Sequence, residues 1–113
     1  MAERIDYIEF PSTDNGKSSA FFQAAFGWGI VGYGPYYSGL DGAGLDGGID
    51  GAKDRVEATM AVIRTDDLDD AERRVVSAGG VITRPQFDFP GGRRFHFREP
   101  GGNELAVYIG GEE

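Results

Sequence analysis

The stretch Ile5-Asp6-Tyr7-Ile8-Glu9-Phe10 alternates apolar and polar residues, as a half-buried strand does, and leads through Asp14 into a helical pattern that ends at Gly27. A second stretch, Met60-Ala61-Val62-Ile63, leads through Asp67 into a helical pattern that also ends at glycine. Three pairs of landmarks share an offset of about 53 residues: Tyr7 with Met60, Asp14 with Asp67, and Gly27 with Gly80. A repeat of this length predicts two modules that must pack together to bury their apolar faces.

Each predicted module continues with three short strands. In the first, a helix over residues 15–26 has four apolar residues on one face at helical spacing: Phe21, Phe22, Ala25 and Phe26. Apolar runs cut by glycine then predict antiparallel strands around residues 29–31, 36–38 and 47–49. In the second, we expect a strand over residues 57–64, a helix begun by Asp66-Asp67, and strands over residues 81–84 or slightly beyond, 93–98 and 104–109. The order is strand, helix and three strands, written twice.

Length, charge and composition exclude several classes of protein. A chain of 113 residues predicts one domain, residues 1–113, and its net charge of −8 disfavours binding to nucleic acid or to anionic membranes. The chain contains no cysteine, which excludes disulfide scaffolds, thiolate zinc sites and cysteine nucleophiles. The first residues form no signal peptide, and no later run is long and apolar enough to span a bilayer, so we expect a soluble, cytoplasmic protein.

The ordered set of motifs resembles the vicinal oxygen chelate superfamily, which includes glyoxalase I, bleomycin-resistance proteins and extradiol dioxygenases. The matching segments are Ile8-Glu9-Phe10-Pro11, Phe21-Phe22, Phe26-Gly27-Trp28, Thr65-Asp66-Asp67-Leu68, Ala78-Gly79-Gly80 and Phe97-Arg98-Glu99-Pro100-Gly101-Gly102-Asn103-Glu104-Leu105. The resemblance implies an α+β fold. Two βαβββ modules, about residues 4–51 and 57–110, would form a half-open, mostly antiparallel β-barrel with helices outside and a ligand cavity inside.

The resemblance also implies where a metal would bind. The family holds a divalent ion with a histidine on the first strand of each module and a glutamate on the last strand. Here those positions fall on Tyr7, Met60 and Ala106, and the first module's last-strand position falls near Gly48. None of these four residues is a ligand of the expected type, so a divalent metal is possible but disfavoured and we expect no cofactor.

Strand alternation indicates which side chains line the cavity, because residues two apart share a face. If the apolar residues pack against the helices, the inner side carries Tyr7, Glu9, Met60, Val62, Arg64, His96, Glu104, Ala106 and Tyr108. Glu9 is then a candidate general base, or a solvated carboxylate paired with Arg64 or Arg98. His96 is either its acid–base partner, half of an atypical metal site, or a hydrogen-bonded wall residue.

The remaining inner residues are candidate ligand-binding groups: Tyr7, Met60, Arg64, Ala106 and Tyr108. The two tyrosines offer rings and hydroxyls that would orient a small organic ligand, or they complete a core. Four further aromatic residues are expected at the cavity rim or at the contact with a second subunit: Trp28, Tyr33, Tyr36 and Tyr37. A homodimer is the expected assembly.

Two functions follow from these residues. The first is metal-independent binding of a small, partly aromatic ligand, as the resemblance to bleomycin-resistance proteins implies. The second is an enzyme, a glyoxalase-like lyase, isomerase or hydrolase, that uses Glu9 and His96 on a carbonyl-containing metabolite. The missing metal ligands favour the first. The convergence of a carboxylate and an imidazole keeps the second open.

Overall fold

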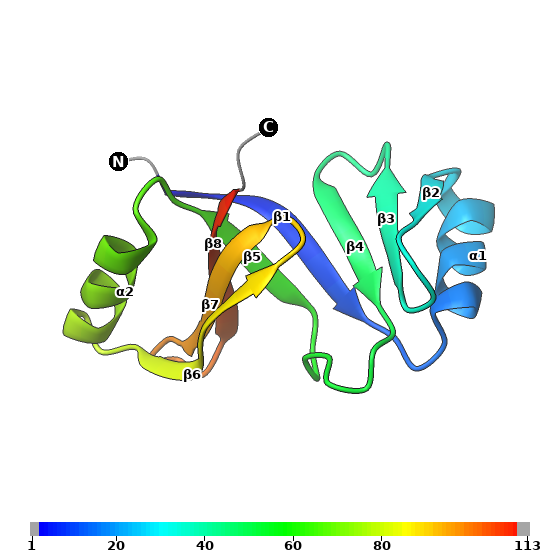
Figure 1. The fold of residues 1–113 in the computed structure, drawn as a ribbon. Helices are drawn as coiled ribbons and strands as arrows, with labels where there is room; N and C mark the ends of the chain where they lie inside the picture. Colours follow the sequence, from blue (N-terminus) through cyan, green and yellow to red (C-terminus); the bar gives the residue numbers. More distant parts are fainter. Residues whose placement is uncertain (1–2, 111–113) are drawn as a thin grey trace. The chain divides into compact units, whose positions relative to one another are not determined.

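The computed structural model describes residues 3–110, and their contacts divide them into two units. One unit, Tyr7–Met60, is called module one here. The other, called module two, contains the described residues up to Asp6 together with those from Ala61 onward. Each helix is followed by three strands, as Figure 1 shows. The α+β class and the two βαβββ modules predicted from the sequence are confirmed.

Module one contains strands β1 (Arg4–Pro11), β2 (Gly29–Gly32), β3 (Tyr37–Asp41) and β4 (Asp46–Asp50), with helix α1 (Asn15–Phe26). The strand order is β2-β3-β4-β1, in which β1 runs parallel to β4 and the other pairs are antiparallel. The residues of β1 before Tyr7 belong by contact to module two. Within residues 3–110, β2 has one hydrogen-bonded neighbour and is therefore an edge strand.

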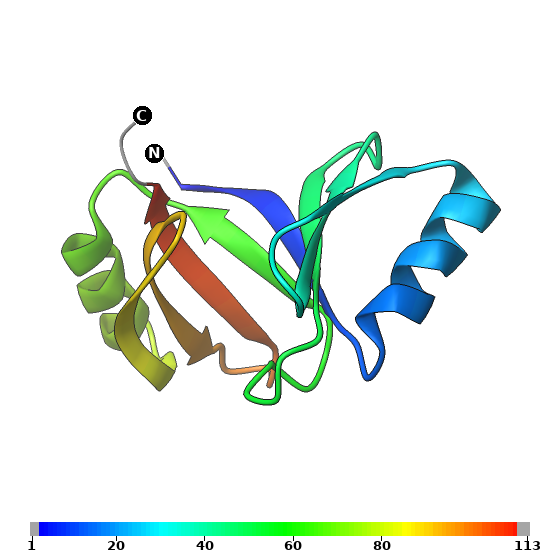
Figure 2. The ribbon, with the colours of Figure 1, turned by 45° about the vertical axis from the view of Figure 1, so that its right-hand side comes forward.

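Helix α1 begins and ends where the sequence predicts. The side chain of Asp14 accepts a hydrogen bond from the Lys17 amide at 3.0 Å, which satisfies a donor of the first turn. Gly27 adopts a left-handed conformation with φ of 75°, and its amide donates to the Gln23 carbonyl. The helix lies to one side of β2, β3 and β4 (Figure 2, blue helix).

The apolar face of α1 packs only in part. The ring of Phe22 lies 5.4 Å from that of Phe10 and 5.2 Å from that of Trp28, measured between centroids. By contrast, Phe21 and Phe26 are 60% and 61% exposed. Polar contacts contribute the rest of the attachment to the sheet, since Asn15 Oδ1 accepts from the Ser38 hydroxyl at 2.7 Å.

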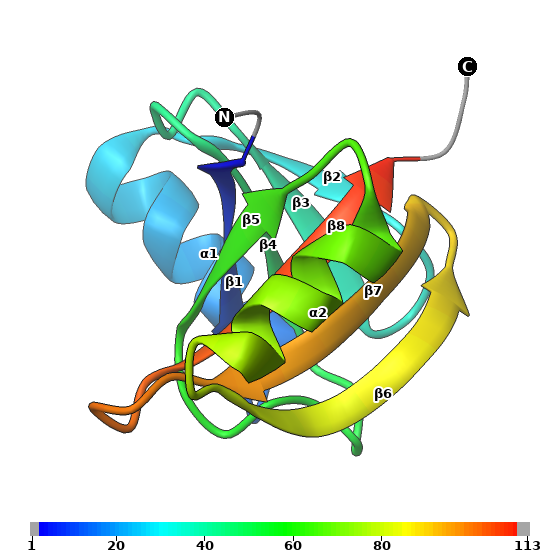
Figure 3. The same cartoon turned by 90° about the vertical axis from the view of Figure 1, so that its left-hand side faces the viewer.

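Module two contains strands β5 (Met60–Arg64), β6 (Val81–Phe89), β7 (Gly92–Arg98) and β8 (Glu104–Gly110), with helix α2 (Leu68–Ser77). The first residue of β5, Met60, belongs by contact to module one. The strand order is β5-β8-β7-β6, with β5 parallel to β8 and the other pairs antiparallel. In the described part of the chain β6 also has one neighbouring strand, so β6, like β2, is an edge strand. Figure 3 shows α2 lying across β7 and β8.

Two strands differ from their predicted bounds. Strand β5 starts at Met60 rather than at Glu57. Strand β6 continues to Phe89, past Pro85, although the sequence indicated an end near Arg84. An edge strand tolerates proline, and the pairing of β6 with β7 shifts register on both sides of Arg84, which accommodates the ring.

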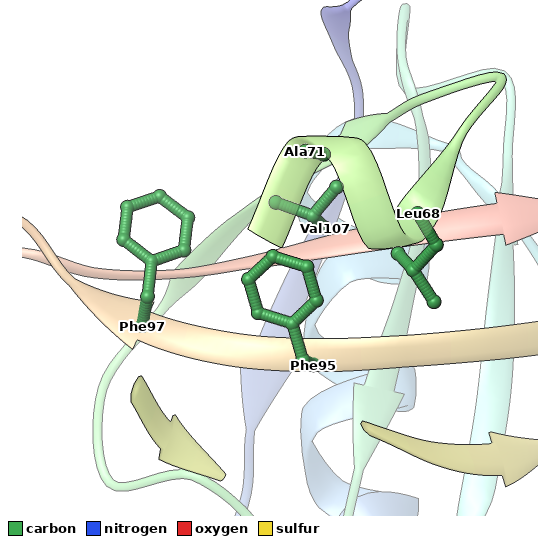
Figure 4. Close-up of a cluster of buried hydrophobic side chains, with 5 residues drawn as sticks. All are labelled: Leu68, Ala71, Phe95, Phe97 and Val107. Carbon is green, nitrogen blue, oxygen red and sulfur yellow. The ribbon is translucent and has the colours of Figure 1, made fainter. Parts of the chain in front are cut away.

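The core of module two lies between α2 and one face of its sheet. Leu68 and Ala71 from α2 meet Phe95 and Phe97 from β7 and Val107 from β8 (Figure 4). Phe95 is fully buried. Because these strand residues face the helix, their neighbours along each strand face the opposite side of the sheet. On β7 that opposite side carries Arg94 and His96.

Candidate functional site

Two tyrosines and a glutamate form a hydrogen-bonded cluster in module one. The Tyr37 hydroxyl donates to Glu9 Oε2 at 3.1 Å and lies 2.5 Å from the Tyr7 hydroxyl. Since the Tyr37 O–H donates its hydrogen bond to Glu9, the Tyr7 hydroxyl is the donor in the pair of phenols. Glu9 is only 5% exposed. Tyr7 and Glu9, predicted from alternation to share a face, therefore meet through a third residue, Tyr37.

Glycines in the middle of the sheet make room for this cluster. Gly48 on β4 is the cross-strand partner of both Glu9 on β1 and Gly39 on β3. A side chain at Gly48 would collide with the ring and hydroxyl of Tyr37, which occupies that space. Gly39 is covered in the same way by Tyr33. Glycine is required here because the neighbouring rings lie directly on the backbone.

The Tyr37 hydroxyl is held in its neutral form. Burial raises its pKa, and so do the Glu9 carboxylate and the Tyr7 hydroxyl. At neutral pH it is therefore a permanent donor to Glu9. From the sequence, Tyr37 was expected at the cavity rim or at a subunit contact. Only the pairing of β3 with β4 shows that its ring covers Gly48.

His96 is one of the buried polar residues of module two, 3% exposed. Its Nε2 atom accepts from Arg94 Nε at 3.1 Å and from Arg94 Nη2 at 2.9 Å. Because Nε2 accepts, we assign the ring proton to Nδ1, which lies 3.8 Å from Glu104 Oε2. Burial first, and then the charges of Arg94 and Arg84, lower the pKa of His96 to about 4. The imidazole is neutral at physiological pH.

This environment favours one of the three interpretations of His96. A general acid must carry a proton that it can give up, and a general base must present a lone pair to the substrate. The low pKa opposes the first requirement, and the contact with Arg94 occupies the lone pair. The hydrogen-bonded wall residue is therefore the interpretation that the geometry supports.

The other predicted site residues fall into two groups. Met60 and Ala106 are fully buried apolar residues. Arg64 and Tyr108 contact each other, with the Arg64 guanidinium carbon 5.6 Å from the centre of the tyrosine ring. The Tyr108 hydroxyl bonds the carboxylate of Asp6, 3.1 Å from one oxygen and 2.9 Å from the other.

The site residues predicted from the sequence did not include the residues that surround His96. Arg94 lies two positions before His96 on β7 and so shares its face, which alternation alone would have shown. Arg84 and Phe87 on β6 could not be placed in this way. The register shifts that flank Arg84 change which residue lies opposite which on β7.

The donor set does not fit the metal site implied by the resemblance. Within residues 3–110, no group of three or more histidine, cysteine, aspartate or glutamate side chains is arranged to hold an ion. Two of the four expected positions, Met60 and Ala106, are apolar, and a third, Gly48, lies under the ring of Tyr37. No step of the proposed function is therefore assigned to a metal.

Comparison with models of known protein families identifies the superfamily of the chain. Residues 4–107 match the family model of the Glyoxalase/Bleomycin resistance protein/Dioxygenase superfamily. The chain belongs to this superfamily. The resemblance stated from its motifs is thus confirmed over nearly the whole sequence. A search of curated proteins finds no match.

Several solved structures share the fold of this chain. A hypothetical protein from Bacillus halodurans C-125 is 10% identical with a TM-score of 0.81, over 100% of this chain and 98% of that one. Methylmalonyl-CoA epimerase from Streptomyces coelicolor, in complex with 2-nitronate-propionyl-CoA, is 13% identical with a TM-score of 0.74, over 99% and 100%. The Mn(II)-bound glyoxalase from Novosphingobium aromaticivorans is 19% identical with a TM-score of 0.68, over 93% of this chain and 38% of that one. At such identities the likeness shows the fold alone.

No helix within residues 3–110 combines the length and apolar character needed to cross a membrane.

Proposed function

We propose that this superfamily member binds a small, partly aromatic organic molecule without a metal and without converting it. The observation that carries the proposal is the replacement of metal donors by packing groups. Tyr37 covers Gly48, and Met60 and Ala106 are buried apolar side chains. Aliphatic side chains and a neutral phenol do not hold a divalent ion, whereas rings with fixed hydroxyls orient organic ligands well.

The state of the polar residues supports binding over turnover. Glu9 already accepts a hydrogen bond from the Tyr37 hydroxyl, and His96 already accepts hydrogen bonds from two N–H groups of Arg94. Groups whose hydrogen bonds are already made within the protein can fix the shape of a binding site and present oriented dipoles to a ligand. A proton-transfer pair would need at least one group able to exchange its proton near neutral pH.

The alternative function is a lyase, isomerase or hydrolase acting on a carbonyl-containing metabolite through Glu9 and His96. One observation favours it, namely that Glu9 is a buried carboxylate held by a phenol that keeps its proton. Buried carboxylates with such donors occur in enzyme sites. If this alternative is right, Glu9→Gln abolishes turnover while the fold is retained, and unchanged turnover removes Glu9 from the mechanism.

Two measurements on one preparation separate these functions. Metal analysis of protein purified without chelator is expected to give well below one ion per chain. A thermal-shift screen is expected to show stabilisation by organic ligands in the presence of EDTA, because a ligand that binds only the folded state raises the melting temperature. A stoichiometric ion that EDTA removes, with loss of stabilisation by ligands, would overturn metal-independent binding.

We also propose that the protein forms a homodimer through module one. Phe21 and Phe26 on α1 expose most of their surface, and Tyr33 and Tyr36 are exposed as well. Exposed aromatic side chains in such number on one small unit are typical of an interface.

A further inference from the structure

The face of the module two sheet that points away from α2 carries alternating guanidinium groups and aromatic rings. The Arg84 guanidinium carbon lies 3.8 Å from the centre of the Phe87 ring, and that of Arg94 lies 5.8 Å from the same ring. Arg94 also lies 5.5 Å from the Phe89 ring, which in turn lies 6.3 Å from the Tyr108 ring. With Arg64 against Tyr108, these contacts form a continuous series over four strands, called here the arginine–aromatic face.

The strand register builds this face. Arg84 on β6 is the partner of His96 on β7, and Arg94 on β7 is the partner of both Phe87 on β6 and Tyr108 on β8. Tyr108 in turn is the partner of Arg64 on β5. Side chains of paired residues lie on the same face of a sheet, so the four strands each contribute one row.

The charge on this face contrasts with that of the chain as a whole. The chain has a net charge of −8, and residues 7–60 contain only three basic side chains, Lys17, Lys53 and Arg55. On the arginine–aromatic face, Arg84 and Arg94 both lie within 5.8 Å of one ring centre. The separation of the two charges is therefore comparable to the Debye length, roughly 8 Å in physiological salt, and they repel each other.

Acidic groups also border this face, at two places. The carboxylate of Asp6 accepts the Tyr108 hydroxyl. Glu104 lies 3.8 Å from His96 and 3.8 Å from Arg98, and it accepts the Thr83 hydroxyl at 2.7 Å. Burial first, and then the charges of Arg94 and Arg84, lower the pKa of His96.

We propose that the arginine–aromatic face is the recognition surface for a planar organic anion, namely an aromatic ring that carries a carboxylate. This inference rests on the proposed small-molecule-binding function and names the chemical class of its ligand. The carboxylate binds the guanidinium groups of Arg84 and Arg94, and the ligand ring packs against Phe87, Phe89 and Tyr108.

Each group has a definite part in this recognition. A guanidinium stacked on a ring keeps its N–H groups in its own plane, where a carboxylate is bound by two parallel hydrogen bonds. Arg84 is stacked on Phe87 and exposed, so it is the group that meets an incoming ligand. Arg94 is buried and held by His96, which makes His96 a positioning residue for Arg94.

The only histidine of the chain makes the test direct. His96 ring signals are followed by NMR while purified protein is titrated with 2-naphthoate, with the isosteric neutral 2-naphthamide, and with 2-naphthyl phosphate. We expect saturable shifts with 2-naphthoate, at least about tenfold weaker binding of the amide, and a rise in the His96 pKa when the anion is bound. Carboxylate binding weaker than phosphate binding overturns the assignment to carboxylate.

Variants separate specific recognition from general charge. Arg84→Gln removes the exposed guanidinium and is expected to weaken 2-naphthoate binding about tenfold or more, with no change for 2-naphthamide. Arg73→Gln is the matched control, because it removes the same charge from a 70% exposed side chain on α2. Equal effects of both variants, or equal binding of the carboxylate and the amide, overturn the inference.

Different results would overturn this inference and the proposed function. Neutral aromatic ligands that bind as tightly as the anions would leave metal-independent binding intact and remove the anion preference. A metal requirement for every ligand would overturn the proposed function, whatever the anion series shows. No saturable shift with any naphthalene anion overturns the inference.

Discussion

Tyr37 and Gly48 depend on each other at the level of single residues. The ring of Tyr37 lies where a side chain at Gly48 would project, and its hydroxyl joins Tyr7 to the buried Glu9. A buried carboxylate is stable only when donors surround it. The position at which the superfamily resemblance implies a metal ligand is therefore used here to hold a carboxylate in place.

Removal of one oxygen atom tests this arrangement. Tyr37→Phe keeps the ring over Gly48 but deprives Glu9 of a donor, so the free energy of unfolding is expected to fall by about 1–3 kcal/mol. Urea denaturation measures the change. Ser77→Ala is the control, because it removes an exposed hydroxyl on α2 and its change should stay within about 0.5 kcal/mol. Equal effects of the two variants would contradict the role given to Tyr37.

Addition of one methyl group tests the same contact from the other side. Gly48→Ala places a carbon against the Tyr37 ring and is expected to destabilise module one by about 1–3 kcal/mol, as overpacked cores do. In a Tyr37→Ser background the collision is absent, and the same change should then be nearly neutral. A loss of the same size in both backgrounds would show that backbone effects, and not the ring, require glycine.

The two helices begin alike but are attached to their sheets differently. Asp14 and Asp67 both accept an amide three residues ahead, at 3.0 Å. Helix α2 then buries Leu68 and Ala71, whereas α1 has no buried residue. The core of module two therefore depends on α2 far more than that of module one depends on α1.

Loss of the cap of α2 is expected to destabilise the protein measurably. Asp67→Ala leaves an amide of the first turn without its acceptor and should lower the free energy of unfolding by about 1 kcal/mol. Denaturant unfolding gives the value, and amide exchange locates the loss in α2. Asp66→Ala removes an adjacent exposed carboxylate that caps nothing, and it should change stability by less than about 0.5 kcal/mol.

Two groups with lowered pKa values, one above the other, make the stability of the whole molecule depend on pH. His96 has a pKa of about 4 in the folded protein, below the ordinary value of 6.5. Glu3 has a pKa of about 2, lowered first by its bond to Arg74 and then by its bond to Thr65, from an ordinary value of 4.5. Either group binds a proton more readily in the unfolded chain. Acidification therefore favours unfolding through His96 first and through Glu3 later.

Replacement of His96 isolates the upper window. Between about pH 6.5 and 4 the unfolded chain takes up the proton that buried His96 refuses, so the free energy of unfolding falls by up to about 3 kcal/mol. Compared with the native protein, His96→Gln should show a flatter profile in this range. Arg74→Gln should leave this range unchanged and flatten the profile only below about pH 4.5. An unchanged slope in His96→Gln would mean that the imidazole is solvated in solution.

Assembly is the remaining property of the whole molecule. Light scattering is expected to give twice the chain mass of 12.2 kDa for the native protein. Phe21→Lys together with Phe26→Lys should shift the population to monomer, because both side chains are exposed on α1 and are expected to lie in the contact. A native monomer would overturn the homodimer, and a variant that remains dimeric would move the contact to another face.

By itself the sequence determined the features that depend on neighbours along the chain. The repeat, both capping aspartates, the glycine ends of the helices and the inner and outer faces of β5, β7 and β8 follow from local periodicity. These features were sufficient for the α+β fold and the superfamily. They also placed Tyr7 beside Glu9, and His96 opposite Phe95 and Phe97.

Only the tertiary structure decided which side chains meet across strands. Tyr37 covers Gly48 because of the register between β3 and β4, and Arg84 meets Phe87 because of the register shifts in β6. Alternation tells which face a residue occupies, but its neighbours on that face depend on pairing between distant segments. A shift of pairing by one residue reverses the faces, and no local pattern in the chain records it. The hydrogen-bonded cluster and the arginine–aromatic face could therefore be seen only in the folded protein.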